Sequence, residues 1–274
     1  MVRTASVISL LAALGGCDSV WGLERARPDG AVDVDDEDGD GVTNAADPCP
    51  HIPFQSTTDV DLDGVPADCD PDDTMLNTQH MFFAFNMLEP GIDVAGGDPV
   101  ANGALVLGAT TDGLSTFVIR DHVAAMVLVD VGYEVLASNI DRGQTSAFDE
   151  IGVYSVHRGF STDNKQRGDV CFFGTHMHDA AHPKPVYLEM DEDEKLQSSV
   201  EDASTLTTTS GRFRMVRTPA AVDCTVFRDG LPSLPDHFDV TDLASTVGKV
   251  AISAQRTRVR LRYIWFAYQP VLQL

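Results

Sequence analysis

Residues 256–268 read Arg-Thr-Arg-Val-Arg-Leu-Arg-Tyr-Ile-Trp-Phe-Ala-Tyr, and this stretch decides the fold class. Its first half alternates arginine with Thr257, Val259, Leu261 and Tyr263. Successive side chains of a strand point to opposite faces, so this period of two places the arginines on one face and the apolar set on the other. The stretch therefore predicts a long β-strand with one buried face.

The arginine face of this strand allows two interpretations. The favoured one is an outer sheet face on which the arginines pair across strands with Asp and Glu. The alternative is a docking face, either for an acidic polysaccharide or for the acidic segment of this same chain. The face comprises Arg256, Arg258, Arg260 and Arg262, and Arg212 and Arg214 show the same alternation.

The remainder of residues 78–274 has a similar texture of short apolar runs separated by Gly, Asp, Asn and Pro. Val, Ile, Phe and Tyr are concentrated in these runs, and no convincing amphipathic helix is present. We therefore expect one all-β sandwich domain. The predicted strands are 80–88, 104–108, 116–120, 124–131, 152–157, 170–174, 186–190, 212–218, 223–228, 249–255 and 257–268.

The order of four of these runs resembles that of concanavalin-like and laminin-G-like jelly rolls. The runs are Gly-Ala-Leu-Val-Leu at 103–107, Val-Leu-Val-Asp-Val at 127–131, Ile-Gly-Val-Tyr-Ser-Val at 151–156 and Val-Arg-Leu-Arg-Tyr-Ile-Trp-Phe at 259–266. The resemblance implies a jelly-roll β-sandwich, with adhesion or glycan recognition as its expected role.

Acidic residues dominate the charge of the chain and gather in one segment. The 274 residues carry 42 acids and 19 Lys and Arg, a formal net charge of -23. Residues 29–73 hold fourteen Asp and one Glu with no Lys or Arg. Nucleic acid is excluded as a partner, because phosphate binding needs a basic surface. Cations are the expected partners.

Two copies of one calcium-loop pattern lie in this segment. Residues 36–47 read D-E-D-G-D-G-V-T-N-A-A-D, and residues 59–70 read D-V-D-L-D-G-V-P-A-D-C-D. Calcium takes six to eight oxygens, which alternate residues of a wrapping loop supply around a glycine turn. The predicted ligands are Asp36, Asp38, Asp40, the Val42 carbonyl and Asp47, followed by Asp59, Asp61, Asp63, the Val65 carbonyl and Asp70.

With Pro and Cys at the flanks instead of helices, residues 33–75 resemble a pair of thrombospondin type 3 repeats. The resemblance implies a coreless segment held by calcium and by a Cys49–Cys69 bridge, acting as a stiff spacer before another domain. Two features depart from the pattern: Leu62 stands where Gly is usual, and Ala67-Asp68 reverses the usual order. Asp72 and Asp73 could serve a further ion.

The first residues predict export and a lipid anchor. Residues 1–16 contain a short apolar run typical of a signal peptide, too short to span a bilayer. Leu14-Gly15-Gly16-Cys17 resembles the lipobox of bacterial lipoproteins, which implies lipidation of Cys17; the alternative is ordinary signal cleavage. Residues 17–32 are the predicted tether. We expect the protein to be located at the outer membrane or the cell surface, although Asp18 leaves retention at the inner membrane open.

Four cysteines remain beside Cys17, an even number that suits a disulfide-permitting compartment. They are Cys49, Cys69, Cys171 and Cys224, which allow three pairings. Two lie in the acidic segment and two in the later domain, so two local bridges are the simplest choice. We expect the second pair on or beside neighbouring strands.

Two further clusters raise the question of catalysis or a second metal. Glu189, Asp191 and Glu194 form E-x-D-x-x-E, which resembles the catalytic strand of laminarinase-type glycosidases, with Glu189 as nucleophile and Glu194 as acid/base. The intervening acids favour a solvated turn. His176, His178 and His182 suit zinc or copper, but a polar loop is favoured.

The sequence thus predicts a non-enzymatic, calcium-binding cell-surface lipoprotein. Its β-sandwich is presented for adhesion or for binding a glycan or surface protein, and the calcium segment holds it away from the membrane. The alternatives are a jelly-roll glycoside hydrolase that uses Glu189 and Glu194, and a structural envelope protein with no ligand.

Overall fold

The computed structural model describes most of residues 36–270. The described ranges are 36–53, 58–74, 78–85, 92–95, 98–101, 104–108, 114–119, 124–138, 148–160, 166–176, 186–192, 195–202, 210–239 and 249–270. All the described residues belong to one compact unit, which spans residues 33–274. The predicted signal peptide, the lipidated Cys17 and the tether all lie outside the described residues.

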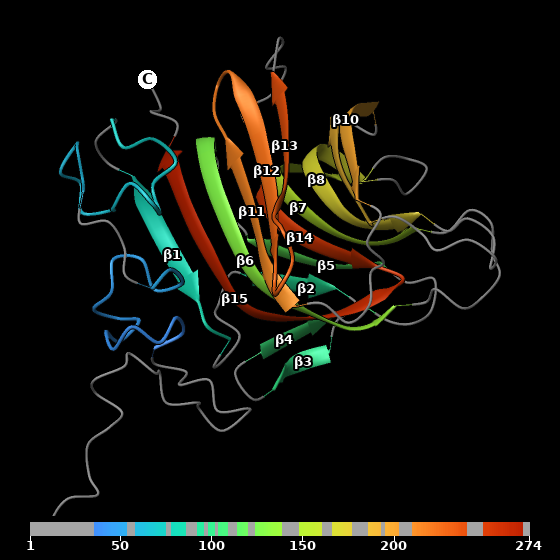
Figure 1. The fold of residues 1–274 in the computed structure, drawn as a ribbon, viewed down its shortest axis with the longest axis horizontal. Helices are drawn as coiled ribbons and strands as arrows, with labels where there is room; N and C mark the ends of the chain where they lie inside the picture. The colour runs from blue at the N-terminus through green and yellow to red at the C-terminus, as the bar shows by residue number, and fades with distance from the viewer. Residues whose placement is uncertain are drawn as a thin grey trace, which may run out of the picture. The chain divides into compact units, whose positions relative to one another are not determined.

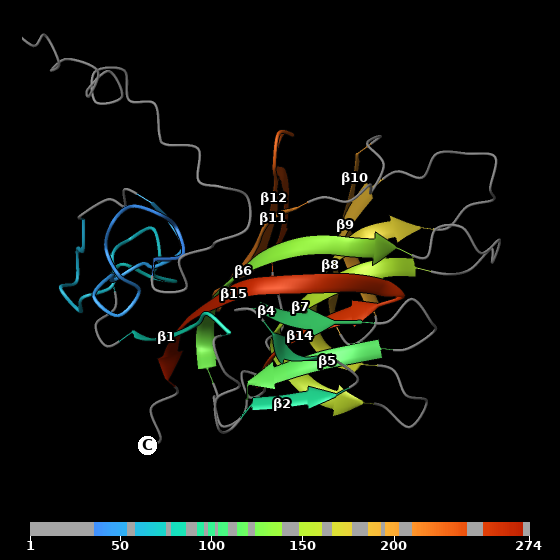
Figure 2. The ribbon, with the colours of Figure 1, turned by 90° about the horizontal axis from the view of Figure 1, so that it is seen from below.

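The described residues of the compact unit form two antiparallel sheets, as expected for an all-β sandwich (Figures 1 and 2). Sheet A has the strand order β13-β12-β11-β6-β15-β4-β3, and β1 also pairs with β15. Its strands are β1 (Gln79–Phe83), β3 (Asp98–Ala101), β4 (Ala104–Leu107), β6 (Ala124–Ser138), β11 (Ser210–Arg217), β12 (Ala221–Arg228), β13 (Leu234–Asp239) and β15 (Thr257–Pro270).

Sheet B has the strand order β10-β9-β8-β7-β14-β5-β2. Its strands are β2 (Ile92–Ala95), β5 (Leu114–Ile119), β7 (Phe148–Phe160), β8 (Gln166–His176), β9 (Val186–Glu192), β10 (Lys195–Asp202) and β14 (Lys249–Gln255). In the described part of the chain, no helix has the length and apolarity that crossing a membrane requires.

The main core lies between the sheets and follows the period of two predicted from the sequence. In β11, Phe213 and Met215 point inward while Arg212 and Arg214 face outward. Each of the eleven predicted strands is present, with bounds shifted by a few residues. The four strands that the sequence did not predict are β2, β3, β10 and β13, which form the two ends of each sheet. These edge strands are short or polar and lack a clear apolar alternation.

A disulfide and ion pairs join the two sheets across the core. Cys171 of β8 and Cys224 of β12 form a disulfide, so the predicted pairing is confirmed, but on facing strands of opposite sheets instead of neighbouring strands. The buried guanidinium of Arg217 in β11 reaches Asp169 of β8, with Nε and Oδ2 2.8 Å apart. A hydrogen bond between two ionised groups is stronger than one between neutral groups.

Polar contacts between β10 and sheet A connect the sheets at one edge. Ser198 of β10 donates to Asp236 of β13 at 2.7 Å. Arg228 of β12 reaches Asp202 of β10, with Nη2 and Oδ2 2.6 Å apart. Two of the exposed sheet edges therefore lie against each other and protect one another from pairing with other chains.

A β-bulge in β15 changes what the outer face of sheet A presents. The pairing with β6 shifts between Leu261 and Tyr263, so an extra residue, Arg262, interrupts the alternation. Before the bulge, arginines alternate outward; after it, Tyr263, Trp265 and their neighbour Ala267 are on that side. Gly132 leaves room for the Tyr263 ring, since a Cβ there would lie 2.4 Å from it.

Replacing Cys171 and Cys224 together with alanine should lower the free energy of unfolding by roughly 2–4 kcal/mol, because the bridge closes a 53-residue separation in the unfolded chain. Urea unfolding followed by far-UV circular dichroism measures this effect. If the urea midpoint and the slope of the unfolding transition were both unchanged, the bridge would not stabilise the packing of the two sheets.

Candidate metal centre and its contact with the sandwich

The first predicted calcium loop, residues 36–47, is wrapped by its own aspartates. The carboxylate of Asp36 accepts hydrogen bonds from the amides of Gly39 at 2.9 Å and Gly41 at 3.2 Å. Asp38 accepts from the amide of Asp40 at 3.0 Å. One carboxylate oxygen from each of these three aspartates lies within 4.8 Å of the other two. The loop thus turns its acidic side chains inward.

The second loop, residues 59–70, is a structural copy of the first. Asp59 accepts from the amides of Leu62 at 2.7 Å and Gly64 at 3.0 Å. Asp61 accepts from the amide of Asp63 at 3.2 Å. These are the same loop positions, 23 residues later in the chain. The two loops thus share the same side-chain to backbone hydrogen bonds at matching positions.

The backbone turns of the two loops match as well. Gly41 and Gly64, at position 6, both have φ of +96°. At position 4 the first loop has Gly39 with φ of +79°, whereas the second has Leu62 with φ of +63°. Leucine adopts this left-handed conformation at an energetic cost that glycine avoids. The Leu62 side chain is 82% exposed, so no packing interaction offsets that cost.

Buried carboxylate oxygens lack hydrogen-bond donors in both loops. Asp38 Oδ2, Asp61 Oδ2 and Asp70 Oδ2 are each shielded from water without a donor in hydrogen-bonding range. Desolvation, with help from neighbouring aspartates, raises the pKa of Asp38 to about 6 and that of Asp70 to about 6. A hard divalent cation is the partner that would satisfy such oxygens.

The structure brings most of the predicted ligands together and adds one. Asp47 lies near Asp38, because its charge contributes to raising the pKa of that residue. In the second loop, Asp61, Asp63 and Asp70 form one group, while Asp59 and Asp61 form another with Asp73. The 12-residue pattern does not include Asp73, although a further ion at Asp72 or Asp73 was expected. The Val42 and Val65 carbonyls stay predicted ligands.

The predicted bridge between Cys49 and Cys69 is present and links the two loops. The bridge and Val65 pack against an apolar patch on the outer face of sheet A, formed by Leu128, Trp265 and Ala267. The segment was expected to be a coreless spacer extending from the sandwich. Instead it packs on the sheet, where the bulge in β15 places Trp265 and Ala267 on the outer face.

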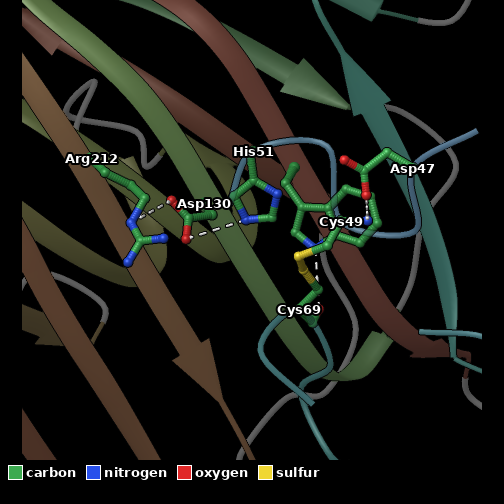
Figure 3. Close-up of a disulfide and its surroundings, with 7 residues drawn as sticks. Asp47, Cys49, His51, Cys69, Asp130 and Arg212 are labelled. Atoms are coloured by element: carbon green, nitrogen blue, oxygen red, sulfur yellow. Dashed lines mark hydrogen bonds and ion pairs between the residues drawn. A yellow bond between two sulfur atoms is a disulfide. The ribbon is translucent and has the colours of Figure 1, made fainter. Parts of the chain in front are cut away.

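His51 is the most deeply inserted polar side chain of this contact (Figure 3). Its Nε2 lies 3.5 Å from Asp130 of β6, and the ring stacks on Trp265 with centroids 5.2 Å apart. Asp130 is fully buried and also lies 3.6 Å from the Nε of Arg212. Burial lowers the pKa of His51 despite the nearby carboxylate. A neutral imidazole therefore occupies the space between the sheet and the loops.

The arginine face combines both interpretations offered by the sequence. Arg260 pairs across strands with Glu134 at 2.6 Å, as the favoured interpretation required. The charges of Arg262 and Arg214 act on residues of the acidic segment, Glu37 and Asp68 respectively. Desolvation raises the pKa of Glu37 to about 7, and Arg262 partly opposes the rise. Arg256 is at a bend between β14 and β15, with φ of +53°, outside the strand.

The other sequence-predicted clusters are not assembled within the described residues. Strand β9 ends at Glu192 and β10 begins at Lys195, so the strand that carries Glu189 stops before position 194. Glu194 itself lies outside the described residues. His176 ends β8, while His178 and His182 also lie outside the described residues.

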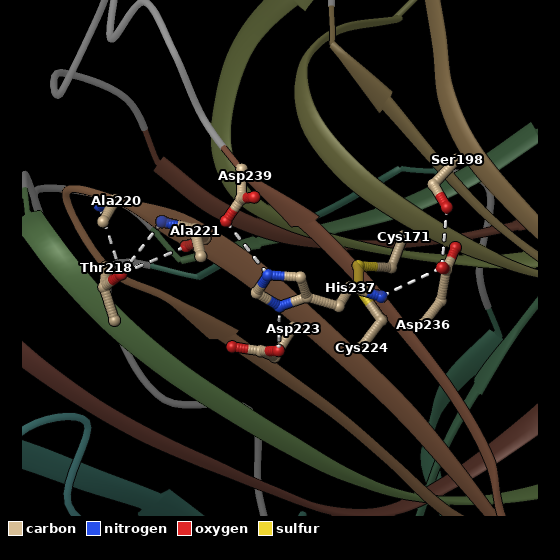
Figure 4. Close-up of polar contacts among 10 residues, drawn as sticks. All are labelled: Cys171, Ser198, Thr218, Ala220, Ala221, Asp223, Cys224, Asp236, His237 and Asp239. Atoms are coloured by element: carbon tan, nitrogen blue, oxygen red, sulfur yellow. Dashed lines mark hydrogen bonds and ion pairs between the residues drawn. A yellow bond between two sulfur atoms is a disulfide. The ribbon is translucent and has the colours of Figure 1, made fainter.

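A polar cluster that the sequence did not indicate lies on the outer side of β12 and β13 (Figure 4). His237 Nδ1 is 2.6 Å from Asp223, and its Nε2 is 3.1 Å from Asp239. These two hydrogen bonds raise the pKa of His237 above its ordinary value. All three side chains are exposed, and the register of the strands, which the sequence does not disclose, brings them together.

Comparison with known proteins gives a likeness of fold. No protein-family model and no curated protein sequence matches the chain. Among solved structures, peanut lectin matches with a TM-score of 0.54 and 13% identity, covering 72% of this chain and all of the lectin. Lotus tetragonolobus seed lectin matches with a TM-score of 0.55 and 11% identity, covering 70% of this chain and all of the lectin.

The sandwich has the concanavalin-like fold. The exoplasmic/lumenal domain of VIP36, in a form bound to calcium and Man3GlcNAc, matches with a TM-score of 0.50 and 9% identity, covering 70% of this chain and 90% of that one. The fold predicted from four strand runs is thereby confirmed. At 9% to 13% sequence identity, the likeness to these proteins concerns the fold alone.

Replacing Leu62 with glycine should tighten calcium binding about two- to fivefold. Glycine removes a conformational strain energy of about 1–2 kcal/mol from the left-handed position. This gain exceeds the entropic cost of ordering the more flexible glycine loop on binding, about 0.5–1 kcal/mol. Titration calorimetry measures the change, with Gly39→Leu as the matched variant that should weaken binding in the first loop. Equal affinity in all three proteins would contradict the inferred strain.

Acidic pH should have opposite effects on the calcium-loaded and chelated proteins. The pKa values of Asp38 and Asp70 are raised, so the chelated fold binds protons more tightly than the unfolded chain, and this part of its stability is lost as pH rises from 4 through 6. Calcium competes with those protons, so its affinity falls below pH 6. Melting temperatures at pH 5 and pH 7 test this prediction. From pH 7 to pH 5, the melting temperature should rise for the chelated protein and fall for the calcium-loaded protein.

Proposed function

We propose that this protein is an exported, lipid-anchored surface protein that binds calcium in two loops and uses a concanavalin-like sandwich to bind glycans. The observation that carries the calcium assignment is the matched geometry of residues 36–47 and 59–70. Both loops direct carboxylate oxygens inward, and Asp38, Asp61 and Asp70 each have one buried oxygen that lacks a hydrogen-bond donor.

The donor set fits calcium better than a transition metal. All the grouped side chains of the two loops are carboxylates, the hard ligands that calcium takes in flexible geometry. A fourth grouping, of Cys49, His51 and Cys69, has soft ligand types, but its cysteines form the disulfide that joins the loops. Zinc would need free thiolates there. When bound, calcium would neutralise the repulsion among the aspartates.

The glycan proposal is supported by the fold and by what remains accessible on it. The structural neighbours include a Bauhinia forficata lectin in complex with GalNAc, with a TM-score of 0.52, and a phage carbohydrate-binding module, with a TM-score of 0.50. Here the calcium segment covers the part of the outer face of sheet A around Leu128, Trp265 and Ala267. We therefore place the glycan on sheet B or on the connections between its strands.

The outer face of sheet B offers an aromatic cluster for this role. Phe172 of β8 contacts Tyr154 of β7 with an edge-to-face geometry at 6.0 Å and is partly exposed. Glu189 of β9 is its direct cross-strand neighbour. A ring with a carboxylate beside it provides a stacking surface and a hydrogen-bond acceptor, the two features that a sugar face requires.

The glycosidase alternative receives less support than binding without catalysis. Retaining hydrolysis needs two carboxyl groups about 5 Å apart, one on either side of the scissile bond. The motif that suggested it requires Glu189 and Glu194 on one strand, and β9 ends at Glu192. The neighbours named above are lectins and a carbohydrate-binding module, which agrees with a binding protein.

Calcium binding should be measured by titration calorimetry on the wild-type protein and on Asp61→Asn. The wild type is expected to bind calcium in both loops, and the variant should lose binding in the second loop, because Asp61 belongs to both of its acidic groups. Asp239→Asn, an exposed change outside the loops, is the matched control and should bind as the wild type does. An absence of heat with the wild type would overturn the calcium assignment.

Glycan binding is tested on an array of immobilised glycans in the presence of calcium. The wild type should retain a defined set of glycans, and Phe172→Ala should lose most of that signal while keeping its melting temperature within a few degrees. Signal equal to that of an unrelated protein on every glycan would instead favour the structural envelope class. Membrane fractionation of Cys17→Ala, expected to release the protein from the membrane, tests the anchor.

A further inference from the structure

We propose that the calcium loops and sheet A unfold and refold as one unit, and that Thr78 and Trp265 transmit the calcium state of the loops to β15. This inference rests on the proposed calcium binding but concerns a different property, the stability of the sandwich. A segment that acts only as a spacer would lose its order without affecting the sheet. The contacts described below predict that the sheet responds as well.

Thr78 joins two predicted calcium ligands directly to sheet A. Its amide donates to Asp63 Oδ2 at 2.7 Å, and its hydroxyl donates to Asp70 Oδ1 at 3.2 Å. The same hydroxyl accepts from the side-chain amide of Gln269 in β15 at 2.9 Å. Thr78 and Gln269 are both buried. A change in the position of either aspartate therefore alters a shielded hydrogen-bond chain that ends in the sheet.

Trp265 forms the second link, next to the disulfide. Its Nε1 donates to the carbonyl of Cys69 at 3.1 Å, and the residue after Cys69 is the ligand Asp70. In the other half of the bridge, the amide of Cys49 donates to the ligand Asp47 at 2.8 Å. The bridge thus connects one ligand from each loop to the same tryptophan. Both loops are therefore linked to β15 through Trp265.

The indole of Trp265 depends on the segment for its burial. It is 1% exposed, with His51 stacked on it at 5.2 Å and His80 at 5.0 Å. His51 belongs to the segment, and His80 belongs to β1, which follows Thr78 in the chain. Removing the segment would expose the indole and would also free the start of β1. The outer face would lose its cover and one of its strands together.

The segment cannot hold this position by itself when its charges are unbalanced. Its described part has few buried apolar side chains, and those that are buried are buried against the sheet. Without a cation, the aspartates of each loop repel one another at close range and raise the free energy of the docked state. Calcium removes this repulsion, so binding energy is converted into stability of the docked sheet.

The experiment uses the full chain with Trp21→Phe, which leaves Trp265 as the only one of the two tryptophans. On addition of chelator, the emission of Trp265 should shift to longer wavelength, at the same free calcium concentration at which calorimetry detects release of the ion. At a hundredfold excess of calcium over the dissociation constant, the melting temperature of the sheet should rise by about 5–10 °C per occupied site.

Thr78→Val removes the shared hydroxyl. It keeps the shape of the side chain and the backbone amide that donates to Asp63. It should still bind calcium, but with less than half of the calcium-induced rise in melting temperature. Thr74→Val is the matched control, because its hydroxyl bonds only to Asp72 within the segment, at 2.5 Å. This control should keep the full rise.

Two results would overturn the proposal. One is calcium release, seen by calorimetry, with the emission of Trp265 unchanged. The other is an equal rise in melting temperature for Thr78→Val and Thr74→Val. An absence of calcium binding in the calorimeter would instead defeat the proposed function, so the two failures are distinguishable.

Discussion

The contact between Trp265 and the acidic segment is the constraint on which the arrangement of this protein depends. A run of aspartates with almost no apolar surface has little reason to order in water, because ordering the backbone costs free energy that burial must offset. The sheet supplies that burial through Leu128, Trp265 and Ala267, and the disulfide presents the segment's own apolar atoms to them. Calcium is the proposed third requirement.

The bulge in β15 determines which side chains make this contact. Under a strict period of two, Ile264, Phe266 and Tyr268 would follow the arginines on the outer face. The extra residue at the bulge shifts the alternation, so those three side chains enter the main core, and Tyr263, Trp265 and Ala267 lie on the outer face instead. One strand thus serves as a charged surface in its first half and as a docking surface in its second.

Much of this could be predicted from the sequence, because period-two alternation and loop spacing are local patterns. The strands of the sandwich and the two loops were predicted from such patterns, the concanavalin-like fold from the order of four apolar runs, and the two disulfides from the placement of two cysteines in each part of the chain. Docking of the segment on the arginine face was one of the two interpretations of the sequence. Its contact with Leu128, Trp265 and Ala267 could not be predicted, because the bulge is accommodated by Gly132 in a distant strand, which makes room for Tyr263. The sequence also gave no indication that His51 contacts the sheet, because its partner Asp130 lies on β6 and is brought near it only in the folded structure. The edge strands were missed because β2 and β3 have only four residues each, and β10 and β13 are largely polar in sequence.

Amide hydrogen exchange on the calcium-loaded and chelated proteins tests the central claim most directly. The account predicts that chelation removes protection from residues 36–47 and 59–70 together with β1 and the end of β15 after Tyr263, while β14 stays protected. Loss of protection confined to the two loops, with β1 and β15 unchanged, would contradict it, because the loops and the sheet would then be independent.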